Sequence, residues 1–219
     1  SSGDVTVTDR KTDTGVPIKH MFVPKGRKNR PGVANPCTYI TIHETGNKAA
    51  TADAAAHGTY LKSDSAEAGQ VSWHYTVDDH AIVQHLPDGE TAYHAGDGAD
   101  GPGNTTSIGV EICVNAGGDF EASKRNTAAL VRLLMGEYGI PLYYVVQHNR
   151  WNGKDCPRTI RETVGGWEAM VIFVLSPPMR SISSWLTILT MAWAGVRLSS
   201  TSVPTAFSVT RLMKSLTTL

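Results

Sequence analysis

The sequence predicts an α/β domain in which helices flank a central sheet, and three observations support this fold class. Short β-branched segments alternate along the chain with an Ala-rich segment and one long amphipathic segment. Clusters of Gly, Pro, Asn and Asp separate these segments, as turn residues do between strands and helices. The 219 residues suffice for one substantial core with an appended segment.

Composition divides the chain into three regions. Residues 1–35 are polar and rich in Gly, Pro, Lys and Arg, which predicts an N-terminal arm or long loop rather than a core element. Residues 36–168 carry the strand and helix patterns and form the predicted domain. Residues 169–219 contain no Asp or Glu, so we expect a poorly defined tail that is out of frame or non-native, and we assign it no function.

The first half of the domain contains strand patterns and one helix pattern. Tyr39–Ile42 alternates β-branched residues and predicts a strand. Residues 51–62 are Ala-rich and predict a helix, with Thr51 as its N-cap. Residues 70–77 and 81–86 flank Asp-Asp-His and predict a hairpin.

The second half of the domain alternates strand, helix and strand. Residues 107–114 (SIGVEICV) predict a strand between two turn clusters. Residues 121–138 predict the longest helix, because apolar residues recur at helical spacing and Gly139-Ile140-Pro141 then stops the pattern. Residues 143–146 predict a short strand that leads into Gln147 and His148.

Charge and targeting signals exclude some classes of partner. Lys plus Arg equals Asp plus Glu at 20 each, which argues against a protein that binds nucleic acid through a dominant basic surface. The apolar run at 182–198 falls short of the roughly 18 uninterrupted residues of a membrane span, so we expect no membrane partner. The chain begins Ser-Ser-Gly-Asp without Met or a signal pattern, and we expect an internal fragment.

Three residues with nitrogen or sulfur ligand atoms lie at predicted strand ends or in loops. His43 ends the strand TYITIH, His148 ends the strand at 143–146, and Cys156 follows eight residues later in a loop. Two imidazoles and one thiolate leave the fourth position of a tetrahedral zinc ion open for water, as in catalytic zinc sites. Solvated or internally paired histidines remain the alternative.

Cys156 has other possible roles. It could pair in a disulfide with Cys37 or Cys113, although three cysteines do not describe a disulfide framework. Cys113 lies in an apolar strand and is expected to pack as a small hydrophobic residue. A nucleophilic Cys156 is a further alternative, but its Gly/Lys/Asp/Pro loop lacks the helix N-terminus that commonly lowers a thiol pKa.

Two charged residues complete the candidate site. Glu111 lies inside a strand, where a carboxylate is costly unless it faces a cleft or a partner, and such a group could act as a general base. Alternation leaves open whether Glu111 faces a cleft or solvent. Lys154 stands two residues before Cys156 and could stabilise an oxyanion, or simply be a solvated loop lysine.

Five motifs in order carry a family resemblance. The segments TIHETGN, SWHYTVDD, AYHAGDG, NTTSIGVEICVN and QHNRWNGKDCP extend over about 120 residues. Together they resemble the zinc-dependent N-acetylmuramoyl-L-alanine amidases (amidase type 2) of phage endolysins and bacterial autolysins, which are related to T7 lysozyme and the peptidoglycan recognition proteins. The resemblance covers roughly residues 35–167 and implies a T7-lysozyme-like fold with a central mixed sheet flanked by helices.

The resemblance also implies roles for individual residues. It implies that Zn²⁺ is bound by the three candidate ligands, that Glu111 is the catalytic carboxylate and that Lys154 is the transition-state cation. His94, Asn104 and Thr105 resemble the family's substrate-cleft rim. Some relatives have Tyr before the His of the second motif, where this chain has Trp73 before His74, so more of the mechanism is expected to depend on Glu111.

The implied activity is hydrolysis of the amide between N-acetylmuramic acid and L-alanine in bacterial peptidoglycan. We expect a monomer that is secreted or released to the cell wall. The first alternative is a module that binds peptidoglycan without cutting it. The non-catalytic recognition proteins typically lack the cysteine ligand, so Cys156 favours the enzyme. The second alternative is a cysteine peptidase, which would not require a metal.

Overall fold

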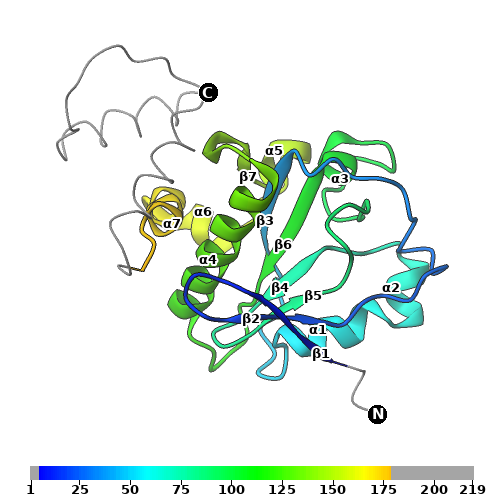
Figure 1. Ribbon diagram of the computed structural model, residues 1–219, viewed down its shortest axis with the longest axis horizontal. Helices are drawn as coiled ribbons and strands as arrows, with labels where there is room; N and C mark the ends of the chain where they lie inside the picture. Colours follow the sequence, from blue (N-terminus) through cyan, green and yellow to red (C-terminus); the bar gives the residue numbers. More distant parts are fainter. Residues whose placement is uncertain (1–4, 179–219) are drawn as a thin grey trace.

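Seven strands form one mixed sheet with helices on both faces (Figure 1). The computed structural model describes residues 5–178. In the sheet order β1-β2-β5-β4-β6-β3-β7, the β1–β2 and β4–β5 pairs are antiparallel and the other neighbours are parallel. The strands are β1 (Thr6–Lys11), β2 (Pro17–His20), β3 (Tyr39–Glu44), β4 (Tyr75–Val77), β5 (Ile82–Gln84), β6 (Ser107–Ile112) and β7 (Val145–Gln147). The predicted α/β class with a mixed central sheet is confirmed.

One long helix and several short ones surround the sheet. They are α1 (Ala54–Leu61), α2 (Asp64–Ala68), α3 (Pro102–Thr106), α4 (Phe120–Tyr138), the 3₁₀ turn η1 (Leu142–Tyr144), α5 (Asn149–Asn152), α6 (Arg158–Glu162) and α7 (Gly166–Leu175). The side chain of Asp119 caps the start of α4 by accepting a hydrogen bond from Ala122 N at 3.0 Å. The helix α4 ends at Gly139, where the sequence predicts a stop, and this glycine adopts the left-handed conformation (φ 65°).

The main core lies between the sheet and the α4–α7 layer. Period-two alternation directs Ile40 and Ile42 of β3 to this face, together with Val110 and Ile112 of β6. Apolar residues of α4 pack against them, and α7 packs on the outer side of α4 (Figure 1). The core is continuous through the sheet, α4 and α7, so it fixes the positions of the central strands.

The opposite face of the same strands carries the polar residues. Parallel pairing aligns His43 of β3 with Glu111 of β6, so both side chains point to the face opposite the α4 core. Strand β7 also runs parallel to β3, and His148 follows its last residue. Because parallel strands end at the same edge of a sheet, the fold brings residues from distant parts of the sequence together there.

The prediction of an arm or loop at residues 1–35 is wrong for residues 6–20. These residues form the β1–β2 hairpin, and β2 pairs with β5 to extend the sheet. Strand β1 lies at the sheet edge and carries charged residues, so its pattern resembles a loop. In β2, Ile18 is the fully buried residue, and one such position is too little to show a period.

Three other boundaries differ from the sequence prediction. Asp53, not Thr51, caps α1, because its carboxylate accepts from Ala56 N at 2.8 Å. The predicted strand at 143–146 begins as the 3₁₀ turn η1 and becomes β7 only at Val145. The predicted hairpin at 70–77 and 81–86 is present as the shorter strands β4 and β5.

The predicted domain end at residue 168 falls inside α7. Met170 and Val174 of this helix are buried in the main core, so the core includes the first residues of the predicted tail. The rest of the predicted tail, residues 179–219, lies outside the described part of the chain, and with it the apolar run at 182–198 and most of the segment to which the hypothesis of a frameshifted or non-native tail applies. Among residues 5–178, no helix combines the length and the apolar character that crossing a membrane requires.

Arg10 of β1 ties the N-terminal hairpin to the domain. Its guanidinium donates to the Tyr75 hydroxyl at 2.7 Å and to the buried Asp88 carboxylate at 3.1 Å. It also pairs with Glu137 near the end of α4, at 2.6 and 2.9 Å. One side chain therefore connects an edge strand, the sheet and the long helix.

We expect Arg10→Ala to lower the free energy of unfolding by about 2–3 kcal/mol, because it leaves the buried Asp88 without its cation. Denaturant unfolding followed by circular dichroism measures the change. Arg158→Ala is the matched control, because its pair with Asp155 is largely exposed and its loss should cost less than about 0.5 kcal/mol. Equal effects of the two substitutions would contradict the structural role of Arg10.

Candidate metal centre

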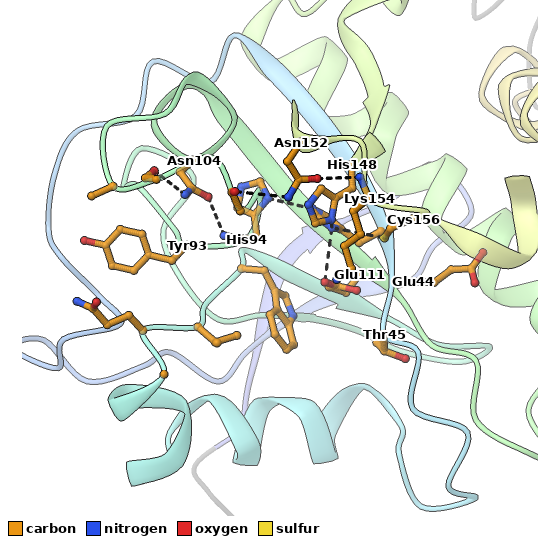
Figure 2. Close-up of a pocket in the computed structure, with 18 residues that line it drawn as sticks. Glu44, Thr45, Tyr93, His94, Asn104, Glu111, His148, Asn152, Lys154 and Cys156 are labelled. Atoms are coloured by element: carbon orange, nitrogen blue, oxygen red, sulfur yellow. Dashed lines mark hydrogen bonds and ion pairs between the residues drawn. The ribbon is translucent and has the colours of Figure 1, made fainter. Parts of the chain in front are cut away.

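Three buried side chains from separate segments converge where β3 and β7 end (Figure 2). The ligand atoms of His43, His148 and Cys156 all lie within 4.8 Å of one another. The two Nδ1 atoms of the histidines are 2.9 Å apart, and the Cys156 sulfur lies 3.9 Å from His43 Nδ1. The structure therefore brings together the trio expected from the sequence.

Hydrogen bonds assign the proton on His148. Its Nε2 lies 2.9 Å from the carbonyl oxygen of Ala95, which can only accept. Nε2 therefore carries the hydrogen, and Nδ1 of the neutral ring carries a lone pair directed at His43. Metal-ligating histidines are commonly oriented by a bond of this kind from the second ring nitrogen.

A longer chain of bonds assigns the proton on His43. The Ser107 hydroxyl donates to the Gly103 carbonyl at 2.6 Å, so its 3.4 Å contact with His94 Nε2 requires that nitrogen to donate. His94 Nδ1 is then an acceptor, and His43 Nε2 donates to it at 2.9 Å. Consequently His43 Nδ1 also carries a lone pair.

Two lone pairs that face each other at 2.9 Å repel unless a cation lies beside them. Burial lowers the pKa of both His43 and His148, so a proton is a poor candidate for this cation. Two imidazole nitrogens and a sulfur form the donor set of a soft divalent metal ion. The site thus fits a metal ion that binds His43, His148 and Cys156.

Cys156 is suited to be a ligand rather than a nucleophile or a disulfide partner. The three cysteines, all within the described residues, are free and buried, so the disulfide alternatives with Cys37 and Cys113 are wrong. Burial raises the pKa of the Cys156 thiol to about 12, and the negative charge of Glu111 acts in the same direction. Such a thiol is a weak nucleophile, whereas a bound cation would deprotonate it.

The side chain of Glu111 faces the cleft and not bulk solvent, a choice that the sequence left open. Its Oε1 lies 3.7 Å from His43 Nδ1, and only 12% of its side chain is exposed. Its Oε2 is buried and has no hydrogen-bond partner within residues 5–178. Burial raises the pKa of this carboxyl to about 8, while the positive charge of Lys154 opposes the shift. A carboxyl with a pKa near neutrality can both accept and donate a proton.

The ligands and Glu111 open into a cleft with a volume of about 570 Å³ (Figure 2). Lys154 lines this cleft from the exposed loop between α5 and α6, close enough to affect the pKa of Glu111 and His43. The remaining lining residues include Gln70, Val71, Trp73, Tyr93, Gly96, Ala99, Asn104 and Asn152. The three candidate ligands, a carboxyl and a cation therefore share one open, mixed polar and apolar cavity.

The three expected rim residues have different positions. His94 is buried and bonded to His43, so it orients a ligand, although it also lines the cleft. Asn104 lines the cleft too, and its side-chain oxygen accepts from the backbone N–H groups of His94 and Ala95 at 2.8 and 2.7 Å. Thr105 donates to the Gly101 carbonyl at 2.9 Å within α3 and lies outside the cleft lining.

Sequence analysis missed several residues that shape the site. Ser107 directs the proton of His94, and Tyr93 and Val71 line the cleft. Trp73 was noted as a departure from relatives but not placed in the cleft, which it lines. The sequence could have indicated Trp73 and Tyr93 as cleft residues, because each directly precedes a histidine of one of the five motifs. Ser107 carries no comparable signal, because its role depends on contacts across three elements.

Comparisons with known proteins agree with this geometry. The N-acetylmuramoyl-L-alanine amidase family model matches residues 33–159. Over 145 residues the chain is 50% identical to the Bacillus subtilis N-acetylmuramoyl-L-alanine amidase CwlH, covering 66% of this chain and 57% of that protein. Over 154 residues it is 50% identical to XlyA of the same organism, covering 70% and 50%. The chain thus spans about half the length of these relatives.

Solved structures show the same fold. The catalytic domain of XlyA aligns with a TM-score of 0.68 at 47% identity, covering 73% of this chain and 99% of that domain. PlyL aligns with a TM-score of 0.65 at 34% identity, covering 75% and 99%. The seven-stranded sheet and its helices therefore correspond to nearly the whole of each of these solved chains.

Glu111→Gln should stabilise the metal-free protein at alkaline pH. The pKa of Glu111 in the folded protein, about 8, lies above its ordinary value of 4.5, so ionisation favours the unfolded chain. The free energy of unfolding should fall as pH rises from about 4.5 through 8. We expect the substitution to gain on the order of 1–3 kcal/mol at pH 9 and little at pH 5.

Urea unfolding of metal-free protein at both pH values measures this difference. Glu162→Gln, at an exposed position on α6, is the control and should leave the pH dependence unchanged. A Glu111→Gln variant with the wild-type pH dependence would show that the carboxyl does not resist ionisation.

Proposed function

The chain belongs to the N-acetylmuramoyl-L-alanine amidase family, and from this premise we propose that it hydrolyses the amide between N-acetylmuramic acid and L-alanine in bacterial peptidoglycan. The observation that carries the proposal is the buried His43, His148 and Cys156 trio with Glu111 beside it in an open cleft. Zn²⁺ is the proposed ion, because a site of histidine and cysteine ligands with an open position is typical of catalytic zinc. The proposed place of action is the bacterial cell wall.

Zn²⁺, when bound by these residues, supplies Lewis acidity toward the amide carbonyl and makes a water molecule more acidic. The protein holds both histidine rings in the tautomer that presents Nδ1, through Ala95 for His148 and through His94 for His43. These bonds fix the ligand geometry before substrate arrives, so little reorganisation is needed during the reaction.

Glu111 is the proposed proton carrier. Its carboxyl lies beside the ligands, 3.7 Å from His43 Nδ1, and its second oxygen is unpartnered within the described residues. The carboxylate accepts a proton from the attacking water and delivers a proton to the nitrogen of L-alanine as the C–N bond breaks. Amide hydrolysis requires both transfers, because an amide nitrogen leaves only after it is protonated.

Lys154 is the proposed cation for the transition state. Its side chain lines the cleft from the loop that also carries Cys156. An ammonium group there stabilises the negative charge that develops on the carbonyl oxygen as water adds. The charge exists only after attack has begun, so this interaction favours the transition state over the bound substrate.

Two alternatives make different use of the same cleft. A non-catalytic peptidoglycan-binding module needs neither a buried proton carrier nor a cysteine ligand, and Glu111 and Cys156 therefore favour the enzyme. A cysteine peptidase needs an ionisable thiol, and the pKa of about 12 for Cys156 argues against it.

Removal of the metal should abolish lysis. We expect a chelator to stop release of peptides from purified peptidoglycan, and stoichiometric Zn²⁺ to restore it, because the buried ligands supply no nucleophile by themselves. Mass spectrometry should find stem peptides that begin with a free L-alanine amine. Lysis that persists in zinc-free protein but stops after thiol alkylation would instead support the peptidase.

Glu111→Gln and Lys154→Ala should reduce kcat by about 10²-fold or more while the zinc content stays near wild type, because each removes one group that acts on the reacting atoms. Lys48→Ala is the control for Lys154, since Lys48 is an exposed lysine outside this cleft. Steady-state rates on purified peptidoglycan, with metal analysis of each variant, provide the measurement. Unchanged turnover in Glu111→Gln would remove this residue from the mechanism.

A further inference from the structure

The loop that carries Cys156 connects the two short helices α5 and α6, so no strand of the sheet holds it directly. It runs from Gly153 after α5 to Pro157 before α6. The other two candidate ligands lie at the ends of strands, His43 in β3 and His148 directly after β7, and the sheet and the core determine the positions of these strands. The place of the sulfur relative to the histidine nitrogens therefore depends on whatever fastens this loop.

Glu44 fastens the loop on its C-terminal side. Its two carboxylate oxygens accept hydrogen bonds from Thr159 N and Ile160 N, both at 2.9 Å. These are orphan N–H groups in the first turn of α6, whose N-cap residue Pro157 provides no side-chain hydrogen bond. Glu44 thus caps α6 from strand β3.

Asn149 fastens the loop on its N-terminal side. Its side-chain amide donates to the carbonyl oxygens of Gly153 and Lys154, both at 3.0 Å. Its backbone N–H donates to the Cys156 carbonyl at 3.1 Å. The segment from Gly153 to Cys156 is therefore folded back onto the residue that follows His148.

Both fastening residues occupy the same position relative to a histidine ligand. Glu44 follows His43 directly, and Asn149 follows His148 directly. We propose that Glu44 and Asn149 are positioning residues that clamp the Cys156 loop to the two histidine-bearing segments and thereby set the affinity of the site for its metal. The inference rests on the zinc site of the proposed function.

The physical argument concerns ligand spacing. A metal ion binds tightly only if its ligands are held near the required distances before it arrives, and groups that orient ligands typically change affinity 10–100-fold. Glu44 lines the cleft, yet both of its oxygens are occupied by α6, so it is already committed to the loop. Asn149 carries no charge, so its effect can come only from geometry.

The test is the zinc dissociation constant of the full chain, measured by competition with a chromophoric chelator. We expect Glu44→Ala and Asn149→Ala each to weaken zinc binding about 10–100-fold. Glu44→Gln keeps one oxygen for one N–H group and should fall between wild type and Glu44→Ala. Asp53→Ala is the matched control, because it removes a carboxylate cap from α1 without touching the loop, and its zinc affinity should equal wild type.

Circular dichroism of each metal-free variant separates loss of fold from loss of affinity, and Glu44→Gln and Asn149→Ala remain informative if Glu44→Ala does not fold. Zinc affinity within twofold of wild type in both alanine variants overturns the inference while leaving the proposed function intact. Equal losses in Glu44→Gln and Glu44→Ala, with Asn149→Ala unaffected, would show a charge effect and also overturn it. A wild-type chain that binds no zinc overturns the proposed function and the inference together.

Discussion

The facing lone pairs of His43 and His148 are the constraint on which the rest of the site depends. Two nitrogens 2.9 Å apart, each carrying a lone pair, repel in a buried setting unless a cation neutralises them. The protein nevertheless holds them there through Ala95 on one side and the His94–Ser107 chain on the other. These hydrogen bonds direct both nitrogens toward one point, so the fold preorganises the two ligands for a metal ion.

Burial shifts the pKa of the three candidate ligands and of Glu111 in the direction that disfavours the charged form. It raises the pKa of Glu111 and Cys156 and lowers that of the histidines. The same desolvation strengthens the electrostatic interaction of these groups with a metal ion and with the nearby Lys154.

The architecture divides these tasks between the two faces of the sheet. On one face, isoleucine and valine side chains of β3 and β6 lock the strands beneath α4. On the other face lie the intervening residues His43 and Glu111, and the same packed strands hold their side chains in position. Cys156 and Lys154 come from a loop that lacks such support. Hydrogen bonds that the Glu44 carboxylate accepts and that the Asn149 amide donates hold this loop in place.

The sequence alone predicted the fold class, most elements and the three candidate ligands that the fold brings together, because strand alternation, helical spacing and the motifs can be read directly from the chain. The sequence prediction was wrong for β1 and β2. Strand β2 pairs with β5, which lies more than sixty residues further along the chain, and the exposed edge strand β1 has the residue pattern of a loop. The orientation of Glu111 toward the cleft, the hydrogen bond between His94 and His43, and the contact of Ser107 with His94 are evident only in the folded chain. Each of these depends on which strands become neighbours, and strand order is fixed by the packed core rather than by any one segment.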